Sequence, residues 1–103
     1  MGKEYDLFVP LYYNDGSRIE PEQFEQIQRI LLSQFEGLTF FPQPNQGFWK
    51  MGDVVYRDEI VIYRIVAQNT RAARKFLRRL KKKLERDLKQ EKVLIIERDI
   101  ETL

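Results

Sequence analysis

Apolar and polar residues alternate from residue 5 to residue 13, and this period of two predicts a strand. Phe8 and Tyr12 belong to the less apolar parity, so we expect them on the face of the sheet that points away from the core. Pro10 has no amide N–H, which predicts a bulge or an end to pairing at this position. The parity that we expect to face the core consists of Tyr5, Leu7, Val9, Leu11 and Tyr13.

Two segments have apolar residues at the three- and four-residue spacing of a helix. The first begins near Pro21, which suits the first helical position, and we expect Gly37 to end it in a left-handed conformation. The second begins at Asn69 or Thr70, either of which can act as an N-cap, and runs to Gln90. The core-facing stripes are Phe24, Ile27, Leu31 and Phe35 in the first helix, and Ala73, Phe76, Leu77, Leu80, Leu84 and Leu88 in the second.

The segment between the two helices has strand composition. Residues 38–42 and 54–67 are rich in aromatic and β-branched side chains, and residues 48–51 continue the extended pattern. Residues 43–47 contain Pro, Asn and Gly and are predicted to form a loop, whereas Gly and Asp at 52–53 are typical of a turn. The simplest interpretation is a hairpin whose first arm is interrupted.

Residues 92–97 are predicted to contain the last strand, with its apolar run at residues 93–96, which completes the order βαββαβ. Two such βαβ halves joined by a hairpin make the ferredoxin-like α+β sandwich, a four-stranded antiparallel sheet with two helices on one face. The length of 103 residues suits one domain of this kind, so we predict a single ferredoxin-like domain over residues 1–103.

Two helices on one face leave the other sheet face uncovered. We predict an interface there that includes Phe8, Tyr12 and Trp49, because such an apolar patch is larger than a monomer normally exposes. Homodimerisation sheet to sheet is the interpretation we favour. The alternative is stacking of nucleic-acid bases on the aromatic side chains, although the aromatic signature of RNA-recognition domains is absent. Further candidates for this face are Phe40, Ile60, Ile62 and Val66.

Charge is unevenly distributed along the chain. The total is +2, but residues 71–89 contain ten basic and two acidic residues, a net of +8, which leaves −6 for the remainder. One interpretation is a solvated helix that pairs with acidic residues of the first helix such as Glu22, Glu25 and Glu36. The other is a surface that binds RNA, DNA or an acidic protein. Its candidate residues are Arg71, Arg74, Lys75, Arg78, Arg79, Lys82, Lys83 and Arg86.

Signals of catalysis are weak. The chain has no His and no Cys, which removes the commonest general base, the commonest metal ligand and the thiol nucleophile. Asp58 and Glu59 are adjacent in a strand and point to opposite faces, so we interpret them as a bulge or as ion-pair partners of Arg57 or Arg64. We therefore predict no catalytic, metal or cofactor residues. A leader or membrane segment is not apparent, which favours a cytoplasmic protein without membrane contact.

The hairpin region resembles small prokaryotic ferredoxin-like proteins of families catalogued as domains of unknown function. The resemblance covers residues 37–66 and rests on Gly37-Leu38-Thr39, Gly47-Phe48-Trp49 and a strand with the acidic pair Asp58-Glu59. The resemblance implies the fold and no particular activity. The chain also resembles the small subunit of the CRISPR adaptation complex in length and element order. That subunit has an acidic residue at the end of its first strand, which is displaced here in Tyr12-Tyr13-Asn14-Asp15, so no metal site is carried over.

These observations predict a small binding or regulatory module that is homodimeric through the open sheet face. Two alternatives remain. One is a nucleic-acid-associated protein that binds RNA or DNA through the basic second helix. The other is a small enzyme of the dimeric α+β barrel kind, with a pocket between sheet and helices.

Overall fold

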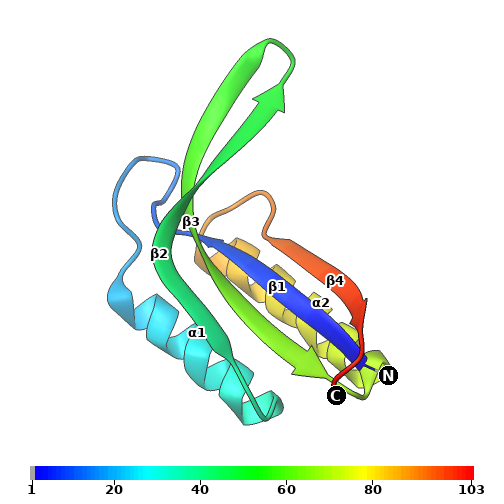
Figure 1. Ribbon diagram of the computed structural model, residues 1–103. Coiled ribbons are helices and arrows are strands. Elements are labelled where there is room, and N and C mark those ends of the chain that lie inside the picture. The colour runs from blue at the N-terminus through cyan, green and yellow to red at the C-terminus, as the bar shows by residue number, and fades with distance from the viewer. Residues whose placement is uncertain (1) are drawn as a thin grey trace.

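Six elements follow one another in the order βαββαβ in the computed structural model, which describes residues 2–103 (Figure 1). All strand pairs are antiparallel, and the sheet order is β2-β3-β1-β4. This confirms the predicted ferredoxin-like α+β fold. The elements are β1 (Gly2–Pro10), α1 (Pro21–Gln34), β2 (Thr39–Met51), β3 (Val54–Ala67), α2 (Thr70–Asp87) and β4 (Leu94–Ile100).

The core lies between the sheet and the helices, as the parity of the first strand predicts. In β1, Tyr5, Leu7 and Val9 are buried, and they lie opposite Ile65, Tyr63 and Val61 of β3. Phe40 of β2 was expected on the open face, but its ring stacks on Tyr63 at a centroid distance of 4.6 Å and so belongs to the helix side. The expectation was wrong because Phe40 and Phe41 are adjacent and both aromatic, so alternation does not show which of the two faces the helices.

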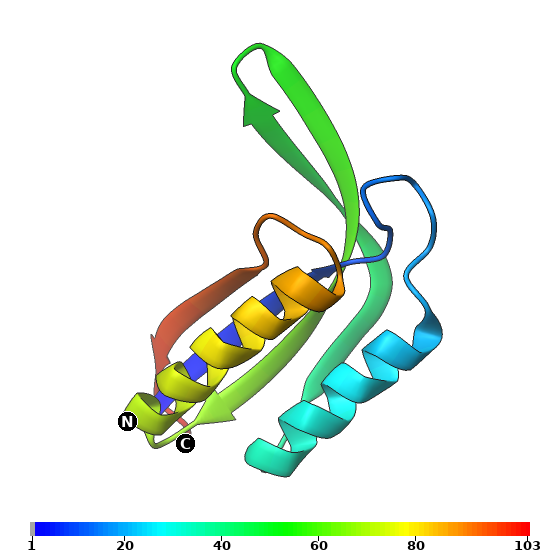
Figure 2. The ribbon, with the colours of Figure 1, turned by 180° about the vertical axis from the view of Figure 1, so that it is seen from behind.

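Both helices cover the same face of the sheet (Figure 2). The buried residues of α1 are Ile27 and Leu31, whose spacing places them on one side of that helix. Asn69 caps α2 by accepting a hydrogen bond from the backbone N–H of Ala72 at 3.2 Å. The buried residues of α2 are Ala73, Leu77, Leu80 and Leu84.

Several predicted boundaries differ from the observed ones. β1 runs from Gly2 and ends at Pro10, where the proline was expected to limit pairing. The predicted left-handed cap at Gly37 is wrong, because α1 already ends at Gln34 and its C-cap residue Phe35 has an extended backbone. A left-handed glycine does occur at the hairpin turn, where Gly52 has a φ of 62°. β4 continues to Ile100, well past the apolar run that predicted it.

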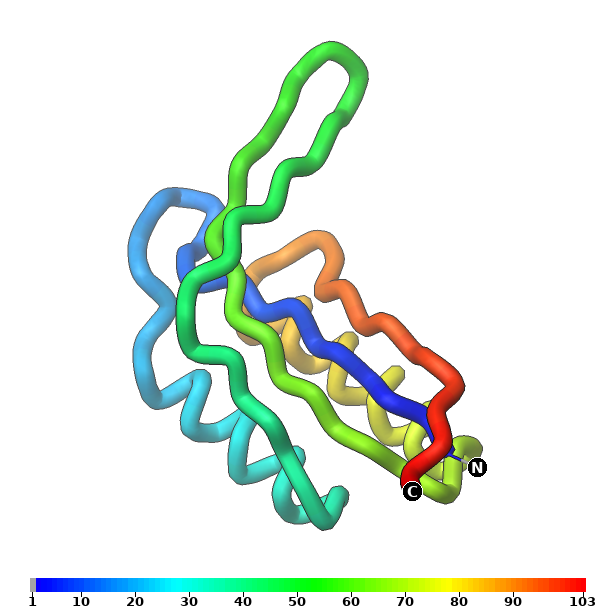
Figure 3. The backbone as a smooth tube through the Cα atoms, in the orientation of Figure 1, coloured from blue at the N-terminus to red at the C-terminus, as the bar shows by residue number. Residues whose placement is uncertain are grey.

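The hairpin of β2 and β3 projects beyond the rest of the sheet (Figure 3). The residues predicted as a loop are part of one strand, because β2 is continuous from Thr39 to Met51. The interruption survives as a register shift between Phe41 and Asn45. β2 has two more residues than β3 across this shift, and such an irregularity interrupts the pairing without ending the strand.

Candidate functional site

The sheet face away from the helices carries an apolar patch at its centre. Phe8 of β1 pairs with Ile62 of β3 on one side and with Leu94 of β4 on the other. Phe41 of β2 pairs with Ile62, which extends the patch across all four strands. No described element covers this face, so Phe8 lies where the sequence predicted it.

The projecting part of the hairpin continues this apolar face. Trp49 pairs with Tyr56 and Met51 pairs with Val54, and in β3 the even positions 54 to 62 share one parity. Asp58 is the one charged residue among these five positions and is exposed. Trp49, Tyr56, Met51 and Val54 are 45%, 51%, 63% and 52% exposed, in that order. We call the combined surface the open face: Phe8, Phe41, Trp49, Met51, Val54, Tyr56, Ile60, Ile62 and Leu94.

Tyr12 does not join Phe8 on the sheet. It lies beyond the end of β1, in an isolated bridge with Arg18, whose guanidinium is 5.8 Å from the tyrosine ring centroid. Of the three predicted interface residues, Phe8 and Trp49 therefore share the open face, and Tyr12 lies at its margin in the β1–α1 loop.

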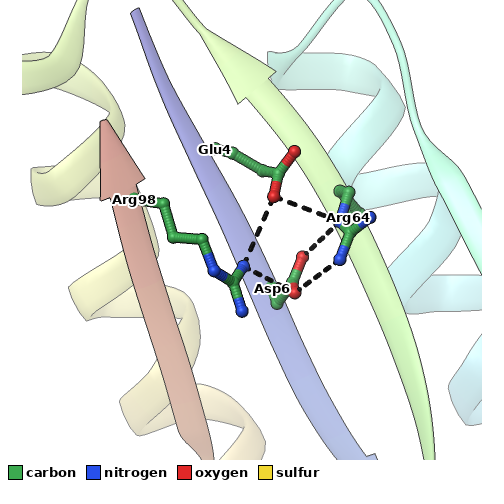
Figure 4. Close-up of polar contacts among 4 residues, drawn as sticks. All are labelled: Glu4, Asp6, Arg64 and Arg98. Carbon is green, nitrogen blue, oxygen red and sulfur yellow. Dashed lines mark hydrogen bonds and ion pairs between the residues drawn. The ribbon is translucent and has the colours of Figure 1, made fainter. Parts of the chain in front are cut away.

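A four-residue ion cluster lies on the same side of the sheet, next to the apolar patch (Figure 4). The Asp6 carboxylate accepts two hydrogen bonds from Arg64, at 2.8 and 3.0 Å, and one from Arg98 at 2.8 Å. The Oε1 atom of Glu4 lies 3.4 Å from Nε of Arg64 and 3.3 Å from a terminal guanidinium nitrogen of Arg98. The bonds from Arg64, followed by those from Arg98, lower the pKa of Asp6 against the opposing effect of burial.

The sequence interpretation missed this cluster. Its members come from three strands, and only the register of the sheet brings them together. A signal was present, because Glu4 and Asp6 share one parity of β1 and arginines occur in two other strands. The cluster has two positive and two negative charges, so this part of the open face has no net charge.

Helix α2 separates its charged residues into paired and unpaired groups. Arg74 binds Glu97 of β4 through two bonds of 2.6 Å, Lys83 pairs with Asp87, and Lys81 pairs with Glu85. Arg86 lies 3.4 Å from Asp87. None of the ion pairs among residues 2–103 joins α2 to α1, so the expected pairing with Glu22, Glu25 and Glu36 is not found.

The remaining basic residues of α2 point away from the core. Within the described chain, Arg71, Lys75, Arg78, Arg79 and Lys82 are exposed and have no acidic partner within ion-pair distance. We call these five residues the outward stripe. A shallow groove of about 720 Å³ follows the N-terminal half of the stripe and is lined by Thr70, Arg71, Arg74, Lys75, Arg78 and Arg79.

Arg74 takes part in a separate polar network between α2 and the edge strand β4. Glu97 accepts bonds from Arg74 and from the Tyr5 hydroxyl, the latter at 2.8 Å. The bond from Arg74 is the main cause that lowers the pKa of Glu97 to about 2. Burial, aided by the bond to Glu97, raises the pKa of Tyr5 to about 12. Arg74 is thus held by the protein itself, unlike the outward stripe.

The acidic pair of β3 has no ion-pair partner in the part of the chain that the structure describes. Arg64, which the sequence offered as a partner, is used by Asp6 and Glu4. Asp58 and Glu59 instead border an open hollow of about 700 Å³ together with Tyr12, Tyr13 and Tyr56.

The described residues contain no group of three acidic side chains placed to hold a metal ion. The space between sheet and helices is filled by buried apolar side chains, which gives no support to an enzyme pocket there. Over residues 2–103 no helix combines the length and the apolarity that a membrane crossing requires.

Comparisons with known proteins show similarity in fold. No protein-family model matches the chain, and no curated protein matches it by sequence. It is similar in structure to a phage SAM lyase solved in complex with S-methyl-5'-thioadenosine, with 19% identity and a TM-score of 0.72 over 95% of this chain and 81% of the lyase. It is also similar to the divalent ion tolerance protein CutA1 from Ehrlichia chaffeensis, with 13% identity and a TM-score of 0.63 over 99% of this chain and 83% of that one. At these identities the likeness establishes the fold alone.

Proposed function

We propose that this chain is a small binding module that works as a homodimer joined through the open face. The observation that carries the proposal is that apolar side chains extend from Phe8 at the centre of the sheet to Trp49 and Tyr56 on the projecting hairpin, with Asp58 as the one charged residue of β3 between Tyr56 and Ile62. Exposed apolar area of this extent is a mark of an interaction surface.

The charges on the open face support a second copy as its occupant. A two-fold contact places a surface against its own copy, so a surface with net charge would repel itself. The ion cluster of Glu4, Asp6, Arg64 and Arg98 is neutral as a whole, so it can be apposed to itself without net repulsion. Asp58, which has no ion-pair partner in the described chain, adds a single negative charge to this face.

The opposite side of the molecule does not support such a contact. The outward stripe on α2 consists of cations only, and two such stripes would repel each other. Repulsion between the stripes therefore disfavours self-association through the outer side of α2.

Light scattering at micromolar concentration tests the homodimer. We expect a mass of about 25 kDa, twice the 12.5 kDa of one chain. The variant Trp49→Asp/Tyr56→Asp places two charges on the open face, and we expect it to have the mass of a single chain.

The matched control is Phe48→Asp/Val55→Asp, which changes two similarly exposed positions on the other side of the same hairpin. We expect this control to keep the mass of the dimer. A wild-type mass of 12.5 kDa, or equal dissociation of both variants, would contradict the proposal.

A further inference from the structure

We infer that the outward stripe of α2 binds the phosphate backbone of duplex nucleic acid without sequence preference, and that the homodimer joins two duplexes. The second part rests on the proposed function.

The stripe is a cationic surface that the protein leaves unneutralised. Arg71–Lys75, Lys75–Arg79 and Arg78–Lys82 are like charges four residues apart, an arrangement that destabilises a helix. The basic residues beside the stripe have acidic partners, namely Glu97, Glu85 and Asp87. An anionic ligand bound to the stripe would reduce the repulsion among these basic side chains, which no acidic residue of the described chain neutralises.

The surroundings of the stripe favour a phosphate backbone over other anions. A protein interface needs an apolar or aromatic centre, and the stripe has only Arg and Lys. A membrane-bound helix inserts its apolar side, which here is buried against the sheet at Ala73, Leu77, Leu80 and Leu84. Single strands stack their bases on aromatic side chains, and Phe76, the aromatic residue of α2, packs edge to face on Phe35 instead.

The dimensions of the stripe agree with contacts to several phosphates. From Arg71 to Lys82 the helix rises by about 17 Å, which equals the rise of roughly five nucleotide steps measured along the axis of a duplex. Contacts to phosphates position a protein on a duplex but do not read its sequence. We therefore expect affinity without sequence preference.

The sheet separates the stripe from the open face. Figure 2 shows α2 on one side of the sheet, whereas the open face lies on the other. A dimer joined through the open face therefore presents its two stripes on opposite outer sides. Each stripe can then hold a different duplex.

Salt titration of binding to duplex DNA and duplex RNA, each in two unrelated sequences, tests the stripe. With five phosphate contacts we expect the logarithm of the binding constant to fall with the logarithm of salt concentration at a slope of about −4.5 on DNA. For Lys75→Gln/Lys82→Gln we expect the magnitude of the slope to decrease by about 2, with equal loss of affinity on every sequence.

The matched control is Lys81→Gln/Lys83→Gln, which removes the same charge from positions that have acidic partners. We expect the control to retain the wild-type slope. Equal slopes for the two variants, or equally tight binding of poly-glutamate or of single-stranded DNA, would overturn the assignment to a duplex backbone. Binding to only one of DNA and RNA would overturn recognition through the phosphates alone.

Capture of a free fluorescent duplex by a bead-bound duplex tests the joining of two duplexes. We expect capture with the wild-type chain and none with Trp49→Asp/Tyr56→Asp, which is expected to bind as a monomer. Failure of the wild-type dimer to capture the free duplex would overturn bridging and leave the homodimer standing. A monomeric wild-type mass in light scattering would overturn both the homodimer and bridging. The salt titration would then decide only whether the outward stripe binds duplex nucleic acid.

Discussion

The Asp6 carboxylate lies on the sheet face that no helix covers, yet only 2% of its side chain is exposed. Arg64 and Arg98 enclose it from the two neighbouring strands, and the ring of Phe41 lies 5.0 Å from the Arg64 guanidinium. Three charge-assisted hydrogen bonds offset the cost of removing the carboxylate from water. Asp6 thus links β1, β3 and β4 on the side of the sheet opposite the core.

Asp6→Asn tests this role. The amide keeps the size of the side chain but loses the charge and one acceptor oxygen, so Arg64 and Arg98 lose the carboxylate to which they make their shortest bonds. We expect the free energy of unfolding to fall by about 2 kcal/mol, as measured by urea denaturation. Glu4→Gln is the control, because its carboxylate has only the longer contacts to the same arginines. Equal effects of the two variants would contradict a central role for Asp6.

Glu97 predicts a pH dependence of stability. Its pKa in the folded chain is about 2, below the value of 4.5 for the free group, so its contribution is present above pH 4.5 and is lost as the pH falls toward 2. We expect Glu97→Gln to be less stable than wild type at pH 7, and the difference to shrink between these two pH values. Urea denaturation across the pH series measures it, and a constant difference would contradict the link to Arg74.

At the scale of residues, the sequence predicted which face of the sheet a side chain lies on, but not which residues form ion pairs. The alternation in the first strand placed Leu7 inward and Phe8 outward, because a period of two decides the face of a strand. The partners of Asp6 lie 58 and 92 positions away along the chain. Such pairs depend on strand register, which hydrophobic patterns do not define between distant strands.

Helix α2 combines an ordinary buried side with an outer side on which charge repels charge. Its apolar stripe matched the sequence prediction, because a spacing of three and four residues is a local property. The ion pair of Arg74 with Glu97 was not predicted, because it depends on how α2 lies against β4, which the pattern of neither element defines.

Neutralisation of the outward stripe is therefore expected to leave α2 intact. Arg78→Gln/Lys82→Gln removes one repulsive pair, so we expect the free energy of unfolding at low salt to stay equal or to rise by up to about 0.5 kcal/mol. Lys81→Gln breaks the ion pair with Glu85 and is expected to lower it by a similar amount. Thermal unfolding at low ionic strength measures both. A clear loss of stability in the first variant would indicate that the stripe has partners within the chain.

The β2–β3 hairpin was predicted correctly, but the loop expected at residues 43–47 is part of a continuous strand. Pro and Gly between residues 42 and 47 are typical of loops, yet the pairing with β3 carries the strand through this segment with a shift of register. Tertiary pairing here overrides local preference, which is the usual reason that loop and bulge are confused.

At the scale of the molecule, the proposed dimer couples folding to concentration. When association stabilises the folded chain, the midpoint of thermal unfolding rises with protein concentration. We expect a tenfold increase in concentration to raise the midpoint by about 3 °C in the wild type. The hairpin variant Trp49→Asp/Tyr56→Asp should show no such rise. A concentration-independent midpoint in the wild type would contradict the dimer.

The two prolines of the register shift have a consequence for how copies of this chain can meet. β2 forms an edge of the sheet, and an exposed strand edge invites strand-by-strand extension into aggregates. Pro42 and Pro44 have no N–H to donate, and they occur within the irregular segment between Phe41 and Asn45. A foreign strand that approaches this edge therefore meets a gap in the hydrogen-bonding pattern. The edge is protected against open-ended growth, while the neighbouring face stays free for a closed contact.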